Sequence, residues 1–256
     1  MYVPTTSSNQ SLAARAVRRS VAGLIRRSLR SSFRSVRWVG AWPPPLPDGR
    51  PVVLYANHHS FFDGYLLWWL LTQHLRRPPL VWMRDHDRIP LFAPLGTLAF
   101  PDDDPRRRAQ TIRETARRMR TVPETALILF PEGEQRPPDT GIGPIATGGL
   151  QRIARLLPYA VWWPVALRLT WWDADRPVAL LAGGTPHDAP TGDEAERLDT
   201  LLDLLRAARP PAFVVENEDV TPPVTAAAQR VLLEGTRSPA ERWDLTPLRG
   251  FLERFA

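Results

Sequence analysis

The stretch PVVLYANHHSFFDGYLLWWLLTQHL, residues 51–75, contains three consecutive patterns that decide how this part of the chain folds. Its beginning, 51–57, is a short apolar run that predicts a buried strand. Its end, 64–75, has the length and apolar content of a helix. The polar run NHHSFFD, residues 57–63, lies between them. We therefore expect a strand, a polar turn and a helix in succession.

The same alternation of apolar runs and helical patterns continues along the chain. Further strands are expected at 79–83, 97–100, 126–130, near 160–168 and near 177–182. Further helices are expected at 88–96 (a short helix and turn), 104–120, 147–157, 193–208, 223–235 and 239–255. Strands that alternate with helices are typical of an α/β fold with a largely parallel central sheet flanked by helices. A length of 256 residues suits one such domain.

The basic residues are concentrated at the N-terminus. Residues 1–40 hold eight arginines and no acidic residue, although the net charge of the whole chain is only +6. From residue 11 to about 38, apolar side chains recur every three or four positions, with most arginines opposite or along the flanks. An arginine-rich amphipathic helix can lie on a membrane and attract anionic lipids. The alternative is a helix that docks on the domain with its basic face in solvent.

These patterns predict a basic amphipathic membrane-surface segment at 1–40, a proline-rich connector at 41–50 and one catalytic domain at 51–256. No apolar stretch reaches the roughly 18 residues needed to span a bilayer, so we expect a peripheral, monotopic protein. Nucleic acid is not an expected partner, because no nucleic-acid-binding motif accompanies the basic residues.

Two residue types are missing from the chain, and their absence excludes whole classes of site. There is no cysteine, which excludes disulfides and Cys-based metal centres. All 33 basic residues are arginine, so a lysine nucleophile, a Schiff base and a P-loop lysine are excluded.

Two polar runs follow predicted strands directly. NHHSFFD follows the strand at 51–57, and PEGEQR, residues 131–136, follows the strand at 126–130. In open α/β sheets, functional residues gather at the carboxyl ends of the strands. We therefore expect both runs to face one crevice.

Within the first run, His58 and Asp63 have a spacing that suits a base and its partner. A carboxylate at the start of the helix can bond one imidazole nitrogen, which fixes the tautomer and raises the basicity of the other nitrogen. Such a base can activate a hydroxyl that belongs to the substrate, and the chain contains no G-x-S-x-G nucleophile elbow. The alternative is a turn histidine and a simple helix cap. No metal is expected, because His58, His59 and Asp63 lack a further ligand at a recognised spacing.

The two runs together resemble a known family. Residues 57–63 match the N-H-x-S-x-x-D block of the glycerolipid acyltransferases, the lysophosphatidate acyltransferase-like family. Residues 130–133 match the F-P-E-G block of the same family, at a typical distance downstream. The resemblance covers about residues 50 to 185, with both blocks in order and each after an apolar strand.

The resemblance implies a function. His58 would be the general base for an acceptor hydroxyl, oriented by Asp63, with His59 as the alternative base. The hydroxyl would attack the thioester of an acyl-CoA or an acyl carrier protein, a co-substrate rather than a resident cofactor. The acceptor would be a lysophospholipid, used in phospholipid biosynthesis at the cytoplasmic face of an anionic membrane. Six other positions would bind substrate: Asn57, Ser60, Phe130, Glu132, Gly133 and Arg136.

Three positions depart from the family pattern where it favours an anionic acceptor. Asp102 stands where the second block, G-x-x-F-I-x-R, has an arginine that contacts the acceptor phosphate. The arginine of E-G-T-R-S is displaced by one position, to Arg136, and residues 146–147 lack the lysine of F-K-x-G. A carboxylate beside a phosphate weakens binding by repulsion. A neutral glycolipid or a hydroxylated isoprenoid is therefore an alternative acceptor, and a lipid-binding protein without turnover is an alternative function.

Overall fold

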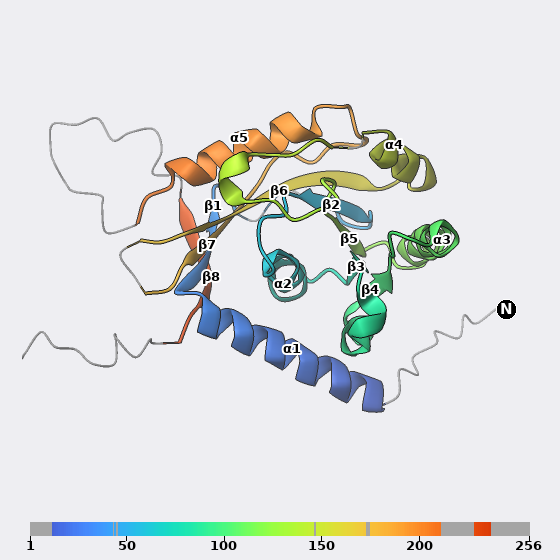
Figure 1. Cartoon of the computed structure of the whole chain (residues 1–256), viewed down its shortest axis with the longest axis horizontal. Helices are drawn as coiled ribbons and strands as arrows, with labels where there is room; N and C mark the ends of the chain where they lie inside the picture. The colour runs from blue at the N-terminus through green and yellow to red at the C-terminus, as the bar shows by residue number, and fades with distance from the viewer. Residues whose placement is uncertain are drawn as a thin grey trace, which may run out of the picture.

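A computed structural model describes residues 12–236 except 43, 45, 146, 173–174 and 211–227. Its centre is a sheet of eight strands in the order β4-β3-β5-β2-β6-β7-β1-β8 (Figure 1). The strands are β1 (Ser35–Val39), β2 (Val52–Ala56), β3 (Pro79–Met83), β4 (Thr97–Ala99), β5 (Ala126–Leu129), β6 (Val161–Thr170), β7 (Val178–Gly183) and β8 (Gln229–Glu234). Among these described strands, only the pairs β1/β8 and β6/β7 are antiparallel, which confirms the predicted, largely parallel α/β sheet.

Helices cover both faces of the sheet. They are α1 (Leu12–Ser32), α2 (Asp63–Trp69), α3 (Pro105–Thr121), α4 (Thr147–Leu156) and α5 (Glu194–Ala207). One core cluster joins α1 and α2 to one face, and two others join α3, α4 and α5 to the opposite face. Figure 1 shows α1 and α2 together on one side and α5 across the other.

Strand β2 lies in the middle of this arrangement. Val52, Leu54 and Ala56 pack toward α1 and α2, whereas Val53 and Tyr55 pack toward the opposite face. All five residues are buried, as expected for a central parallel strand with both faces covered. The expected helix at 64–75 consists of α2 and a π-helical turn, Leu70–His74. The polar run NHHSFFD therefore follows directly from a fully buried strand at the centre of the sheet.

Two helix predictions are wrong. The N-terminal helix ends at Ser32 instead of about residue 38, and β1 follows it, paired with β7 and β8. The alternation Val36, Arg37, Trp38 has the period of a strand, and the first and last of these side chains are buried. The helix expected at 223–235 is replaced by β8 at its end, because β8 pairs along the free edge of β1. The helix expected at 239–255 lies outside the described residues.

Helix α1 is docked on the domain through its apolar face. Val21, Ile25 and Leu29 are almost fully buried, and the helix packs against α2 and the 3-10 helix Pro90–Leu95. The exposed side carries four arginines, at positions 18, 19, 26 and 27. No helix in the described part of the chain is long and apolar enough to cross a membrane. The division at residues 40 and 50 stays a prediction, although β1 already belongs to the central sheet.

Candidate active site

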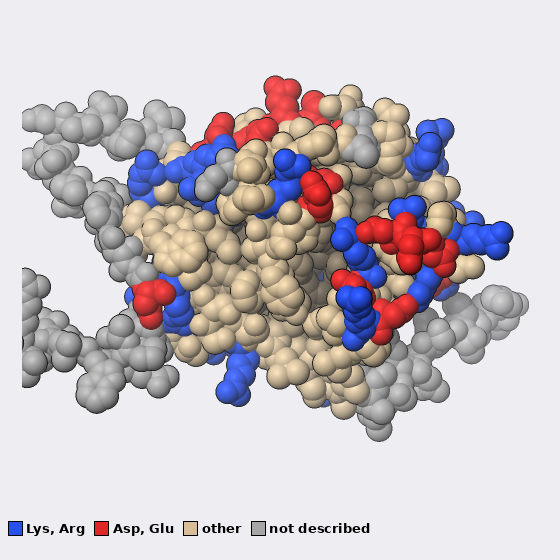
Figure 2. All heavy atoms as spheres, in the orientation of Figure 1, with Lys and Arg blue, Asp and Glu red and all other residues tan. Residues whose placement is uncertain are grey.

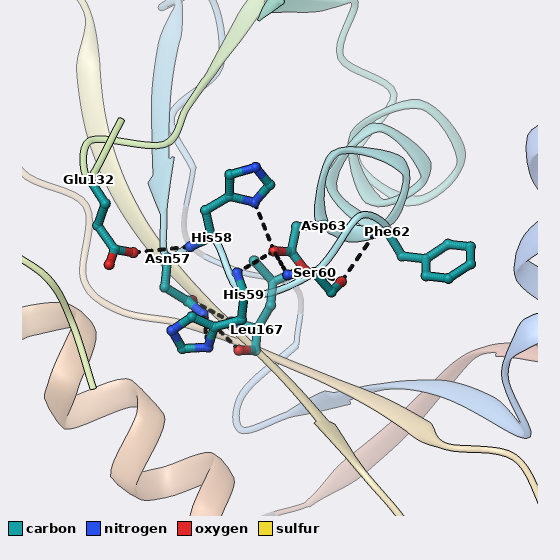
Figure 3. A network of polar contacts seen from close by, with 8 residues as sticks. All are labelled: Asn57, His58, His59, Ser60, Phe62, Asp63, Glu132 and Leu167. Carbon is teal, nitrogen blue, oxygen red and sulfur yellow. Dashed lines mark hydrogen bonds and ion pairs between the residues drawn. The ribbon is translucent and has the colours of Figure 1, made fainter. Parts of the chain in front are cut away.

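The two polar runs meet at one edge of the sheet. Strands β2 and β5 are parallel neighbours, with Tyr55 opposite Leu129, so both chains leave the sheet at the same place. The His58 backbone N–H donates to Glu132 Oε1 at 3.0 Å, and the Arg136 N–H donates to the His58 carbonyl at 2.8 Å. These contacts bring the two runs together at the carboxyl ends of their strands (Figure 3). That both runs face one crevice stays a prediction.

His58 and Asp63 form a direct pair. Nδ1 of His58 lies 3.0 Å from Oδ2 of Asp63, and the Asp63 side chain is only 1% exposed. The same Oδ2 accepts the backbone N–H groups of His59 at 2.7 Å and Ser60 at 2.8 Å. Asp63 Oδ1 accepts the hydroxyl of Ser60 at 2.7 Å. The sequence places the carboxylate at the first residue of α2, and the turn closes around it.

This pattern of donors determines the imidazole tautomer. An ionised carboxylate only accepts hydrogen bonds, and two backbone N–H groups already point at Oδ2. Nδ1 of His58 therefore carries its proton toward Asp63, and Nε2 is left as the basic nitrogen. Figure 3 shows this second nitrogen pointing away from Asp63. The side chain of His58 is 26% exposed, so a substrate hydroxyl can reach it.

Phe130 stacks on one face of the His58 imidazole. The two rings are stacked, with centroids 4.2 Å apart and an interplanar angle of 21°. Phe130 itself packs on the core cluster of the α1 and α2 face. The ring of His58 is thus fixed by a carboxylate at its edge and an aromatic ring at its face.

Asn57 and His59 flank the His58–Asp63 pair and bond to each other, and Asn57 also bonds to a neighbouring strand. Asn57 is completely buried and exchanges two hydrogen bonds with the backbone of Leu167 on β6: Nδ2 to the carbonyl at 2.9 Å, and the Leu167 N–H to Oδ1 at 2.8 Å. Nδ2 of Asn57 also lies 3.0 Å from Nδ1 of His59. Because the amide nitrogen is a donor, Nδ1 of His59 is the acceptor of this hydrogen bond. Burial lowers the pKa of His59, and its Nε2 is also buried. Neither nitrogen of His59 is placed to act as a base.

Glu132 joins the two runs from the β5 side. Its side chain is 0% exposed, with Oε1 accepting the His58 N–H and Oε2 accepting the Gly143 N–H at 2.8 Å. Sequence reasoning assigned Glu132, Asn57 and Ser60 to substrate binding. The structure brings all three to the site. Asn57 and Glu132 bond backbone groups, and Asn57 also contacts His59. The hydroxyl of Ser60 donates to Asp63 and accepts the Phe62 N–H. Their substrate contacts stay a prediction.

The outer part of the site contains paired charges. Gly133 has a φ of 75° and is exposed in the turn after Phe130. Arg136 lies beside two carboxylates, with its Nη1 3.1 Å from Glu134 Oε1 and its Nε 4.0 Å from Glu132 Oε2. Sequence reasoning did not single out Arg84, at the end of β3. Its guanidinium pairs with Asp102 at 2.7 Å and donates to the Gly133 carbonyl at 3.2 Å.

The described residues contain no cluster of three or more side chains arranged to hold a metal ion. The arrangement of a buried carboxylate, an oriented imidazole and an accessible Nε2 suits the removal of a proton from a hydroxyl that enters the crevice.

Known proteins of one family resemble this chain. Residues 43–168 match the family model described as Acyltransferase. No curated protein matches the chain significantly. Among solved structures, the chain is similar to the 1-acyl-sn-glycerophosphate (LPA) acyltransferase PlsC from Thermotoga maritima, with 17% identity and a TM-score of 0.48. That similarity covers 75% of this chain and 78% of the other.

Proposed function

Because this chain belongs to the acyltransferase family through residues 43–168, we propose that it moves a fatty acyl group from an acyl thioester to a lipid hydroxyl. The observation that carries this proposal is the contact of His58 Nδ1 with the buried carboxylate of Asp63. It leaves Nε2 of His58 as a base that faces open space.

The reaction follows from that geometry. Nε2 of His58 removes the proton of the acceptor hydroxyl as its oxygen attacks the thioester carbonyl. The C–S bond then breaks, and the imidazolium returns the proton to the departing thiolate. Asp63 stabilises the imidazolium between these steps. The nucleophile belongs to the substrate, so the proposal needs no acyl-enzyme.

Histidine substitutions test the mechanism. We expect His58→Ala to reduce acyl transfer by about 10²- to 10⁴-fold, the usual contribution of a general base. His86→Ala is the matched control, because His86 also pairs with an aspartate, Asp87, but lies outside the NHHSFFD turn. The rate is followed as free thiol released with and without acceptor lipid. Full activity in a folded His58→Ala variant would refute the mechanism.

The same assay separates the alternatives. Thiol release that needs no acceptor would indicate a thioesterase. No release with any donor, together with retained lipid binding, would indicate a lipid-binding protein that has lost turnover.

For the acceptor, we propose a lysophospholipid, the substrate class that the family resemblance implies. A neutral glycolipid or hydroxylated isoprenoid is the second candidate, and one contact favours it. Arg84, the cation next to the Gly133 turn, is paired with Asp102, so its charge is compensated. A screen of lysolipids against neutral hydroxylated lipids, with products identified by mass spectrometry, decides between them.

We also propose that the protein acts at the cytoplasmic face of a membrane. The exposed arginines of α1 can attract anionic headgroups. Phe61, next to Ser60, is 69% exposed, and Leu24 on α1 is 58% exposed. Figure 2 shows a broad, mostly uncharged area over α2 and the adjoining part of α1, with basic side chains at its lower edge and a hollow between it and the charged side chains over β3 and β4. A lipid surface on this area would deliver an acceptor close to His58.

Liposome binding tests the membrane proposal. Each arginine near an anionic surface contributes about 1 kcal/mol, so replacing arginines 18, 19, 26 and 27 by glutamine weakens binding by up to about a thousandfold. The matched control replaces four exposed arginines of α3, at positions 106, 113, 117 and 120. Equal losses in the two variants, or binding that salt does not change, would contradict the assignment of the surface to α1.

A further inference from the structure

An open pocket of about 380 Å³ lies between α3 and α4, away from the α1 and α2 face. Its walls are largely apolar and include Trp82, Phe100, Ile112 and Ile153. The rings of Trp82 and Phe100 are stacked, with centroids 4.3 Å apart and planes within 9°. Its size and apolar lining are those of small-molecule sites, which add a few polar groups for orientation. The His58 mechanism leaves this pocket unused.

The polar groups of the pocket are two arginines, one from each helix. Arg108 lies over the Phe100 ring at 5.9 Å, and Arg152 is exposed on α4. Within the described part of the chain, neither guanidinium forms an ion pair, unlike Arg84, Arg107, Arg117 and Arg118. The only acidic residue of α3, Glu114, is occupied by Arg117 and Arg118, and α4 has no acidic residue. The pocket is therefore both apolar and cationic.

One part of the pocket lining lies near the carboxyl ends of β3 and β4, at the edge of the sheet that carries the active site. Trp82 lies near the end of β3, Phe100 follows β4, and Pro105 begins α3. Strands β3 and β4 are the second and third strands from β2 in the sheet. At the usual spacing of neighbouring strands, they lie about 10 and 14 Å from β2. His58, in contrast, stacks on Phe130 toward the α1 and α2 face. A ligand held in the pocket must cross the edge of the sheet to reach His58.

We propose that this pocket, lined by Trp82, Phe100, Ile112, Ile153, Arg108 and Arg152, binds the phosphorylated adenosine end of a coenzyme A thioester. The inference rests on the proposed acyl transfer and identifies its donor. The apolar walls suit the adenine ring, and the two unpaired guanidiniums suit its phosphates. The extended pantetheine arm spans the remaining distance over the ends of β3 and β5 and brings the thioester to His58. An acyl chain would make no use of two unpaired arginines, and a carrier protein would need a convex or flat surface instead of a concave pocket.

Truncated donors provide a selective test. Hexadecanoyl-CoA is compared with S-hexadecanoyl-N-acetylcysteamine, which has the same thioester but no nucleotide. We expect Arg108→Gln and Arg152→Gln each to raise the KM for hexadecanoyl-CoA about tenfold, the effect of one lost charge-assisted contact. Their KM for the truncated thioester stays unchanged. Arg113→Gln is the matched control, because Arg113 is exposed on α3 and does not line the pocket.

A second variant tests the cavity without removing charge. Ala109→Trp fills the pocket and is expected to abolish binding of coenzyme A and of adenosine 3′,5′-bisphosphate, measured by calorimetry on the whole chain. Thermal unfolding confirms that each variant is folded.

The failures of the two proposals are distinguishable. If no thioester supports transfer, the proposed function fails, and calorimetry with coenzyme A still tests the pocket. If both donors respond equally to the arginine substitutions, or neither responds, the nucleotide site is wrong. If the arginine substitutions raise the KM for an acyl carrier protein donor and leave the KM for the coenzyme A donor unchanged, the pocket is part of a protein-binding surface. That result overturns the inference.

Discussion

Asp63→Asn tests how the site controls the imidazole of His58. The substitution keeps the size of the side chain and replaces one oxygen by an amino group. Two backbone N–H groups, from His59 and Ser60, point at the Oδ2 position from 2.7 and 2.8 Å. They require an acceptor there, so the amide oxygen of the asparagine occupies that position. The amino group then faces Ser60 Oγ, which can accept a hydrogen bond because a hydroxyl both donates and accepts.

The consequence is that the tautomer of His58 is preserved and only the charge is lost. A hydrogen bond to a charged group contributes about 1.5–3 kcal/mol to stability, and a neutral bond contributes less. If the imidazolium of the transition state loses that amount, the rate falls by about 10- to 150-fold. This is a smaller loss than the one expected for His58→Ala.

The assay is single-turnover acyl transfer by the wild type, Asp63→Asn, Asp63→Ala and His58→Ala, with denaturant unfolding as a check on folding. Asp63→Ala removes the acceptor of three N–H groups and is expected to be the least stable of the four. A rate for Asp63→Asn as low as that of His58→Ala would show that the tautomer had changed. A rate equal to wild type would show that the charge of Asp63 has no role. Either result refutes the reasoning.

Three further predictions concern the groups around the pair. Glu132→Ala leaves the N–H groups of His58 and Gly143 without an acceptor. At about 1–3 kcal/mol per group, it is expected to cost about 2–6 kcal/mol of unfolding free energy. The control Glu134→Ala, at an exposed residue, changes that free energy by less than about 0.5 kcal/mol. Asp102→Asn removes the charge that pairs with Arg84. Because an exposed ion pair contributes up to about 1 kcal/mol, the ratio of kcat/KM for phosphate-bearing acceptors to kcat/KM for neutral acceptors is expected to rise about two- to fivefold. An unchanged ratio would show that this ion pair has no role in acceptor recognition. Burial lowers the pKa of His59 and of His74, so the unfolded chain binds more protons below its own histidine pKa of about 6.5. The free energy of unfolding is therefore highest above pH 6.5 and decreases as the pH falls toward the histidine pKa values of the folded chain, by at most about 1.4 kcal/mol per pH unit for each histidine. Denaturant unfolding at pH 7.5 and 5.0 measures this loss. A double His59→Gln, His74→Gln variant should lack it.

The contacts around His58 indicate why these substitutions differ in their effects. Asn57, Ser60 and Glu132 each bond at least one backbone group, so each restrains a segment of the chain around the pair. The imidazole then needs only two side-chain contacts, with Asp63 and Phe130. A substitution in the support changes the stability of the turn, whereas a substitution in the pair changes the chemistry.

Much of this protein was determined by local sequence. The buried strand at 52–56, the polar turn and helix α2 follow from one change of pattern between residues 51 and 75. The pairing of His58 with Asp63 also follows, because five residues across a strand-to-helix turn leave few other places for the carboxylate. These features depend on the order of neighbouring residues and the geometry of one turn.

Other features were decided only by tertiary structure. Most of residues 35–39 were expected to belong to the N-terminal helix, yet they form a strand because β7 and β8 provide its two partners. The apolar face of α1, which suits a membrane equally well, is buried on α2 and the 3-10 helix beside it. The link from Glu132 to His58 and Gly143, and the pairing of Arg84 with Asp102, join residues that are distant in sequence. The physical reason is the same in each case: hydrogen bonds and burial are satisfied by whichever segments the strand order brings together, and a single sequence does not specify that order.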